Sequence, residues 1–199
     1  MVVEPAFVSE DRFTREEFRA WIRELPASDR HRYELLSGRI AMTPPAGWPH
    51  SAVTARIVAA LVVHVDARRL GTVQESSAGY DLPSGDCVQP DVSYFSRDTL
   101  RGGPTPRVGG SVEFSPDLVV EVLSVSTRKR DLGEKREIYE RNQVAECWVV
   151  DPVAGTVTVF VREATTGGVG FDEGTTRDAG RVPSRLFPDL DLAIERLLD

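Results

Sequence analysis

The chain is poor in cysteine and in long apolar runs, and both shortages exclude classes of protein. Of its 199 residues only Cys87 and Cys147 are cysteines, with no Cys-x-x-Cys pair, so the sequence predicts neither a disulfide framework nor a thiolate zinc site. We interpret both as buried free thiols. No apolar run approaches the ~18 residues of a membrane span, and the first residues lack the basic and apolar segments of a secretory signal. We therefore expect a cytoplasmic protein.

Basic residues are fewer than acidic ones. The counts are 24 Lys and Arg against 31 Asp and Glu, a formal charge of −7 with a pI near 5.1. This balance argues against a protein that coats nucleic acid through net charge alone, but it leaves local contact open. The hydrophobic share of 41% and charged share of 28% are typical of a soluble globular chain. We expect one domain over residues 1–199, since a single core commonly serves ~100–200 residues.

The first half of the chain predicts two helices and a hairpin. Thr14 and Glu17 form a capping box that opens a helix over residues 14–24. The segment YELLSGRIAM indicates two short strands with a turn at Ser37-Gly38. The longest helix carries the apolar residues from Val53 to Val65, and Gly71 stands where its C-cap is expected.

Strands dominate the middle of the chain. We expect them at TVQESSAGYDL, after the turn at residues 83–86 and at DVSYF, whereas residues 96–116 are glycine- and arginine-rich and predict a mobile surface loop. The apolar run DLVVEVL predicts a strand covered on both faces. A helix over residues 127–141, strands at ECWVV and TVTVFV, a loop over residues 163–180 and a short helix within 192–198 complete the expectation.

Glu121 breaks the apolar pattern of DLVVEVL. Side chains alternate along a strand, so Glu121 shares one face with Val119 and Leu123. An unpaired carboxylate there costs several kcal/mol, and a metal, a cation or a raised pKa must offset the charge. The alternative is an acid at a sheet edge or one paired with a buried arginine. Glu121 is the first candidate site residue.

Asp91 is a second carboxylate that sequence order places near the first. It follows Pro90 and begins DVSYF, although an aspartate at a strand start is also common turn chemistry. If the two strands are neighbours, Asp91 and Glu121 lie side by side. Two adjacent carboxylates are what a hard divalent cation such as Mg²⁺ requires.

Lys135 is one of only two lysines in the chain. Its spacing from Leu132 and Tyr139 puts it on the helical stripe that packs on the sheet. An ammonium group on an inward stripe is unusual. The alternatives are snorkelling or an i,i+4 pair with Asp131.

Several further charged residues are weaker candidates. Glu34 lies among apolar neighbours, with a solvent-facing strand position as its alternative. His50, at a predicted helix start, is a candidate phosphate contact, with capping or solvation as its alternative. Basic residues beside the carboxylates or in the expected loop are candidate nucleic-acid contacts, namely Arg101, Arg107, Arg128, Lys129 and Arg130.

A resemblance to a known family runs from about Phe13 to Val161. RYELLSGRI, the later His50, QPDVSYF, SPDLVVEVLSVST, DLGEKREIYE and VAECWVVDP resemble the successive motifs of the Uma2 family, a branch of the PD-(D/E)XK nuclease superfamily. The resemblance implies a restriction-endonuclease-like α/β core, in which helices flank a mixed central β-sheet. It equates Asp91 with the acid of the PD motif and Glu121 with the acid of the second motif.

This chain departs from the superfamily pattern at one position. Leu123 stands where the superfamily has lysine, whereas Lys135 matches the lysine that the Uma2 pattern carries on the following helix. Val125 replaces a usual proline. The resemblance also makes Glu34 an additional metal ligand.

The sequence hypothesis is a metal-dependent nuclease that hydrolyses DNA phosphodiester bonds. Asp91, Glu121 and the backbone carbonyl of Val122, with Glu34, would hold Mg²⁺ or Mn²⁺, and Lys135 would orient water or neutralise a phosphate oxygen. A homodimer suits the cutting of two strands. The alternatives are a catalytically inactive nuclease-like domain that binds protein or nucleic acid and, last, a glycosidase with two carboxylates and no metal.

Overall fold

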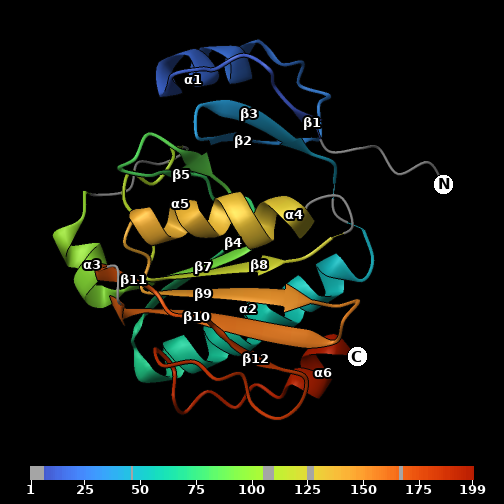
Figure 1. Ribbon diagram of the computed structural model, residues 1–199, viewed down its shortest axis with the longest axis vertical. Helices are drawn as coiled ribbons and strands as arrows, with labels where there is room; N and C mark the ends of the chain where they lie inside the picture. The colour runs from blue at the N-terminus through green and yellow to red at the C-terminus, as the bar shows by residue number, and fades with distance from the viewer. Residues whose placement is uncertain (1–6, 46, 105–109, 125–127, 166–167) are drawn as a thin grey trace.

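Two β-sheets and the helices between and around them make up the protein (Figure 1). The computed structural model describes residues 7–45, 47–104, 110–124, 128–165 and 168–199. Within these residues the larger sheet has seven strands in the order β11-β10-β9-β8-β7-β4 with β12 beside β10. Its strands are β4 (Gly71–Glu75), β7 (Val92–Ser96), β8 (Leu118–Val122), β9 (Glu146–Asp151), β10 (Thr156–Thr165), β11 (Gly168–Phe171) and β12 (Thr175–Arg177).

The larger sheet is mixed, as the resemblance implies. Strands β8 and β9 are parallel, and the other described pairs in this sheet are antiparallel. Every residue of β8 is buried, which confirms the expectation of a strand covered on both faces. Strand β7 pairs with β8 with Val92 opposite Val120. The two strands expected to carry the acids are therefore neighbours at the centre of the sheet.

Helix α2 (His50–Arg68) covers one face of the larger sheet. Its 19 residues reach the length and mean hydropathy of a membrane span. In the fold, however, its inward residues pack against β7, β8 and β9 in the larger core cluster and are fully buried; they are Val53, Ile57, Leu61 and Val65. The short helix α6 (Ile194–Leu198) joins the same cluster through Ile194 and Leu197. The apolar composition of α2 thus serves the core.

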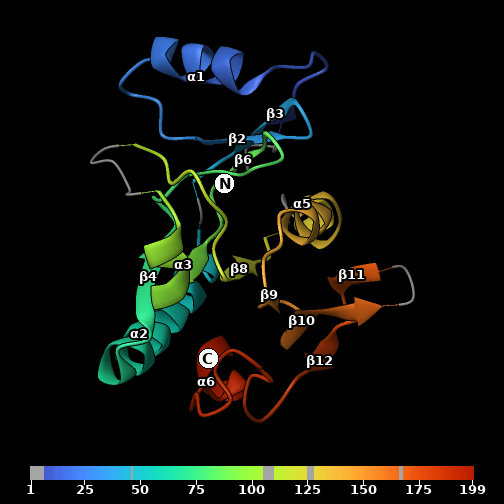
Figure 2. The same ribbon diagram turned by 90° about the vertical axis from the view of Figure 1, so that its left-hand side faces the viewer.

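A helical segment covers the opposite face of the larger sheet and lies between the two sheets (Figure 2). It consists of α4 (Arg128–Arg130), the π-helical turn η1 (Asp131–Lys135) and α5 (Arg136–Arg141). Ile138 and Tyr139 are fully buried against Val119 and Leu123 of the sheet. The division of β8 into two faces, with Val119 and Leu123 toward α5 and the even-numbered residues toward α2, follows the predicted alternation.

The smaller sheet carries the N-terminal part of the chain. Its order is β1-β3-β2-β6-β5, with β1 (Phe7–Val8), β2 (Arg32–Leu36), β3 (Arg39–Thr43), β5 (Tyr80–Asp81) and β6 (Cys87–Val88). Helix α1 (Arg15–Glu24) packs on its outer face, away from α5 (Figure 2), and begins at the predicted capping box of Thr14 and Glu17. The hairpin turns at Ser37 and Gly38, both with positive φ. These elements match the expectation.

Gly71 is not the C-cap of the long helix. Arg69 takes the left-handed conformation that ends α2, and Gly71 begins β4 opposite Ser96. A Cβ on Gly71 would lie 1.9 Å from the backbone oxygen of Phe95. The glycine is therefore explained by a close approach of two strands.

Two segments that the sequence predicted as loops contain regular structure. Residues 97–102 form α3 (Arg97–Gly102), because Ser96 caps the helix by accepting a hydrogen bond from the Thr99 amide. Residues 163–180 contain the end of β10 together with β11 and β12. The glycine content of this segment predicted a loop, but its threonines favour strands, and Thr176 pairs with Thr158 of β10.

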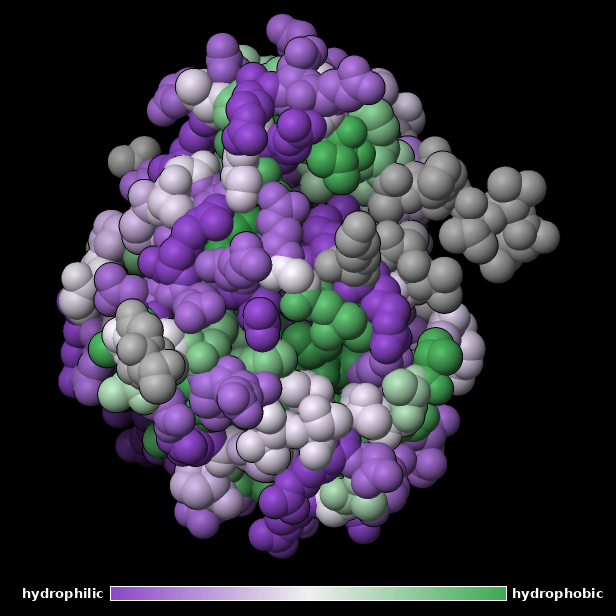
Figure 3. Space-filling view, viewed as in Figure 1, coloured by the Kyte–Doolittle hydropathy of each residue, from purple (hydrophilic) through white to green (hydrophobic). Residues whose placement is uncertain are grey.

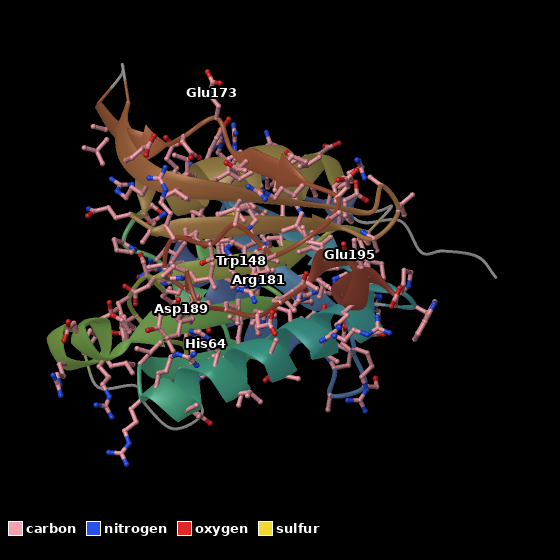
Figure 4. The ribbon with its side chains drawn as sticks, turned by 90° about the horizontal axis from the view of Figure 1, so that it is seen from below. His64, Trp148, Glu173, Arg181, Asp189 and Glu195 are labelled. Carbon is pink, nitrogen blue, oxygen red and sulfur yellow. The ribbon has the colours of Figure 1, made fainter. Side chains whose placement is uncertain are left out.

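The face that carries α4 and α5 is mainly hydrophilic (Figure 3). Apolar residues show on this face in the middle of the view and again near the top. On the side seen from below, His64 and Asp189 lie together beside α2 (Figure 4). His64 packs edge-on against Phe187, with ring centroids 5.4 Å apart. This arrangement agrees with a packing role for His64.

Candidate active site

Glu121 lies at the end of the central strand β8 with 2% of its surface exposed. Its Oε1 atom is 2.6 Å from Lys135 Nζ, and it also accepts a hydrogen bond from the Tyr139 hydroxyl. Strand β8 lies between β9 and β7, so the alternative of a sheet edge is wrong. The alternative of a buried arginine is right in part, because Glu121 is one of the carboxylates that raise the pKa of the largely buried Arg32 against the effect of burial, while Glu121 forms its ion pair with Lys135. Burial, followed by the charges of Glu121 and Glu34, raises the pKa of Tyr139 well above 10. The phenol therefore stays protonated and donates to the carboxylate.

Lys135 joins two carboxylates from different sheets. It is 2% exposed, and Nζ lies 2.6 Å from Glu121 Oε1 and 3.0 Å from Glu34 Oε1. This burial excludes snorkelling. The side chain of Asp131, the other suggested partner, lies outside the described residues.

The prediction that Lys135 shares a buried helix face with Leu132 and Tyr139 is right for Tyr139 and wrong for Leu132. Tyr139 is fully buried one helical turn later, but Leu132 is 40% exposed. The π-helical turn over residues 131–135 has a wider repeat than an α-helix. Leu132 therefore faces outward while Lys135 faces the sheet.

Glu34 reaches the same amine from β2 of the smaller sheet. It is 2% exposed, so the solvent-facing alternative is wrong. Its Oε1 also accepts a hydrogen bond of 2.8 Å from the Gln89 amide. Burial opposes ionisation, but Lys135, Arg130 and the Gln89 amide together lower the pKa of Glu34. Glu34 is therefore an ionised partner of Lys135.

Asp91 lies just before β7, across from Glu121 when the β7–β8 register is extended by one residue. It is 2% exposed. Its Oδ2 accepts hydrogen bonds from Val122 N at 2.8 Å and from His50 Nε2 at 3.0 Å, and its Oδ1 lies 3.0 Å from Arg32 Nη1. Burial alone would raise the pKa of Asp91, but His50, Arg32 and Lys135 lower it to about 2.

The structure thus brings together the four residues predicted as catalytic, from four parts of the chain. Sequence reasoning assigned no role to Arg32, Tyr139 or the Gln89 amide. Arg32 had a usable signal, because it shares a face of β2 with Glu34 at i,i+2. Tyr139 lay on the predicted stripe with Lys135. The contact of Gln89 is made by its backbone, and no side-chain pattern marks it.

The predicted nucleic-acid contacts fall in different places. Arg128 and Arg130 belong to α4 beside the cluster, where Arg128 lies 2.5 Å from Asp151 and Arg130 donates to Thr43 Oγ1. Arg101 is on α3, which follows the far end of β7, so the structure separates it from the carboxylates (Figure 1). Arg107 and the side chain of Lys129 lie outside the described residues.

His50 begins α2, as expected for a helix start, but its ring contacts the protein. The Nε2 atom bonds to Asp91, and the ring is 12% exposed at the side chain. Neither capping nor solvation describes this position. The contact with Asp91 occupies Nε2, and the contact of His50 with a phosphate stays a prediction.

The donor atoms fit a small hard cation better than zinc. Carboxylates and a strand-end carbonyl at Val122 are oxygen ligands, whereas zinc sites prefer histidine and cysteine. Among the described residues, no three His, Cys, Asp or Glu side chains surround a common point. Mg²⁺ commonly uses one or two carboxylates and keeps several waters. The residues present fit such an ion.

Together the fold and the cluster define a restriction-endonuclease-like α/β protein, with acids on adjacent strands and a lysine beside them. The sequence model of the family named Uma2, described as "Putative restriction endonuclease", matches residues 15–195. The chain belongs to this family. The match extends beyond residue 161, where the quoted motifs end.

A solved structure from Anabaena variabilis ATCC 29413, described as "a putative nuclease belonging to DUF820", shares the fold. The superposition covers 94% of this chain and 97% of the other with a TM-score of 0.74, at 21% sequence identity. No curated protein matches the sequence significantly.

Proposed function

We propose that this protein is a divalent-metal-dependent nuclease that hydrolyses DNA phosphodiester bonds. The observation that carries the proposal is the buried cluster in which Lys135 pairs with Glu121 and Glu34, while Asp91 lies across from Glu121, just before the neighbouring strand begins. Burying these charges is costly, and strained electrostatics of this kind concentrates at functional sites. Family membership supports the same activity.

Asp91, Glu121 and the carbonyl of Val122 would hold Mg²⁺ or Mn²⁺, whereas Glu34 holds the amine of Lys135. The ion would supply a lowered pKa for bound water and charge stabilisation at the phosphoryl group. Asp91 is ready for this role because its low pKa of about 2 keeps it anionic at neutral pH. The amide of Val122 and the ring of His50 fix the orientation of its carboxylate.

Lys135 would place its amine beside the reacting phosphate. A compact ammonium suits either the orientation of a water molecule or the neutralisation of a non-bridging oxygen. Glu34 and Glu121 hold the amine from two sides, and the Tyr139 hydroxyl fixes Glu121. Glu34 and Tyr139 thereby act as positioning residues for Lys135 and Glu121.

The test is cleavage of plasmid and single-stranded DNA with Mg²⁺ or Mn²⁺. We expect Asp91→Asn, Glu121→Gln and Lys135→Ala each to lower the rate about 10²–10³-fold, as removal of one such group typically does. The matched controls Asp191→Asn and Arg181→Gln alter an exposed ion pair on the side shown in Figure 4 and should cleave like wild type. Cleavage that survives all three site changes contradicts the proposal.

An inactive nuclease-like domain remains the competing function, because Leu123 packs into the core where the superfamily lysine would stand. Titration calorimetry with Mn²⁺ separates the two. The active enzyme should bind the ion and lose binding in Asp91→Asn, whereas an inactive scaffold should release no carboxylate-dependent heat. If duplex DNA is cut on both strands, we propose a homodimer, which a light-scattering mass will test.

A further inference from the structure

Trp48 is turned to solvent beside the cluster. Its side chain is 78% exposed, whereas Trp148 is fully buried and Trp21 is partly buried. Tryptophan is highly buried on average, since its ring offers a large apolar area. Leaving this area in water next to a charged site calls for an explanation by binding.

The segment that carries Trp48 is tied to the cluster at both ends. Arg130 donates to Thr43 Oγ1 at the end of β3, and His50 at the start of α2 donates to Asp91. Ser51 N also donates to Gly47 O at 3.1 Å. Because two residues of chain span at most ~7 Å, the Cα atom of Trp48 lies within that distance of the Cα atom of His50, whose ring contacts Asp91.

The composition of the segment restricts the backbone around the indole. Proline occupies positions 44, 45 and 49, and each proline ring fixes its φ angle. Less conformational freedom is therefore lost when the ring makes a contact. This favours a platform held in place before its ligand arrives.

The chemistry of an indole restricts the class of ligand that Trp48 can bind. Its face stacks on the face of a nucleobase, with little dependence on which base it is. Within a duplex, the neighbouring base pairs cover both faces of each base, so a stacking side chain requires an unpaired, terminal or extruded base. Arg128 on α4 is half-exposed and already pairs with Asp151, so the indole is the stronger candidate for the contact.

We propose that Trp48 stacks on an unpaired base next to the phosphodiester that is cut, so that the substrate is a strand with single-stranded character. This inference rests on the proposed nuclease function, because the bound strand is a substrate only if the protein cleaves it. The stacking contact itself is measurable without cleavage. Trp48 binds substrate and takes no part in the chemical step.

The experiment measures binding to the full chain with Glu121→Gln present, in Ca²⁺, so that the probe is not cut. The probes are single-stranded oligothymidylate, an abasic oligomer of equal length and charge, and a blunt duplex. Of the three probes, we expect only oligothymidylate to quench the fluorescence of the exposed tryptophan. Trp48→Ala should weaken oligothymidylate binding about 5- to 150-fold, the range given by base stacking, and should change abasic binding less than twofold.

Two further variants separate stacking from apolar contact and from general damage. Trp48→Phe keeps an aromatic face and should retain most of the affinity, whereas Trp48→Leu should behave like Trp48→Ala. Val63→Ala removes another exposed apolar side chain, 71% exposed and on α2, the helix that follows Trp48. It should bind oligothymidylate like the parent.

The outcomes separate this inference from the proposed function. Equal binding of abasic and base-containing strands, or binding that Trp48→Ala leaves unchanged, overturns the inference even if the wild type is an active nuclease. Trp48-dependent quenching without any metal-dependent cleavage would support the stacking contact and overturn the nuclease function. Preference for the intact duplex over the single strand also overturns the inference.

Discussion

Lys135 is the positive partner of two carboxylates in the site. Two ionised carboxylates from different sheets share its amine, and all three groups are about 2% exposed. Buried charges of this kind cost desolvation free energy that only their mutual pairing offsets. The lysine therefore has a structural role in addition to its proposed chemical one.

We expect Lys135→Met to lower the free energy of unfolding by about 3–5 kcal/mol, because it leaves Glu34 and Glu121 buried without the amine. Urea unfolding measures the change. The triple change Glu34→Gln, Glu121→Gln, Lys135→Met should recover part of the loss. A Lys135→Met protein as stable as wild type contradicts the pairing.

Cys87 provides a prediction with a defined pH dependence. Burial, and then the nearby Asp81, raises the pKa of its thiol from 9.0 to about 12. The protonated form is therefore favoured in the folded state, and the thiolate is scarce until the pH nears 12. Alkylation by iodoacetamide at pH 8.5 should be slow in the native protein and fast in urea; rapid native labelling of Cys87, located by mass spectrometry, contradicts this assignment.

At the scale of elements, periodicity predicted most of the fold but failed where the repeat changes. The capping box of Thr14 and the hairpin turn at Gly38 depend on neighbours in sequence, so the sequence predicts them well. The π-helical turn shifts the repeat and turns Leu132 outward, which a 3.6-residue period does not predict. Gly71 depends on a contact with a strand more than twenty residues away.

The candidate site was predictable in its residue types and less so in its contacts. Glu121 and Lys135 are charged residues at positions where the sequence pattern predicts apolar ones, so the sequence alone marks them as candidates. Arg32 meets Asp91 only because the smaller sheet lies against the larger one, and the Gln89 amide meets Glu34 because β2 pairs with β6, a strand about fifty residues later in the chain. Such pairings depend on tertiary packing, for which the sequence carries no local pattern.

Two glycine substitutions test the contrast between a close approach and open space. Gly71→Ala should destabilise the protein by more than about 2 kcal/mol, since its Cβ would meet the Phe95 backbone oxygen at 1.9 Å and force β4 away from β7. Gly133→Ala, in the π-helical turn, meets nothing within 4 Å. It should be neutral or stabilising by up to about 1 kcal/mol.

Denaturant midpoints of the two variants provide the comparison. Equal effects of Gly71→Ala and Gly133→Ala would contradict the explanation of Gly71 by strand contact. If the Gly133→Ala variant also cleaves DNA at the wild-type rate, the substitution has left Lys135 in place.

At the scale of the whole molecule, the charged cluster lies where the two sheets meet. Glu34 and Arg32 come from the smaller sheet, and Asp91 and Glu121 from the larger, with Lys135 on the helical segment between them. A cation bound by Asp91 and Glu121 would therefore stabilise the folded form beside the contact between the sheets.

We expect 10 mM Mg²⁺ to raise the melting temperature by about 2–5 °C, if the dissociation constant is near 1 mM. Calorimetry in matched ionic strength measures the shift. Asp91→Asn should abolish it, and Asp191→Asn, an exposed acid remote from the cluster, should preserve it. A shift that persists in Asp91→Asn would place the ion elsewhere.

The amine shared by Glu34 and Glu121 has a consequence for how the protein reaches its folded form. Because the chain carries its own counter-ion for these acids, maturation need not await a metal supply, in contrast to small zinc modules that collapse under chelators. Purification in EDTA should therefore yield a folded protein.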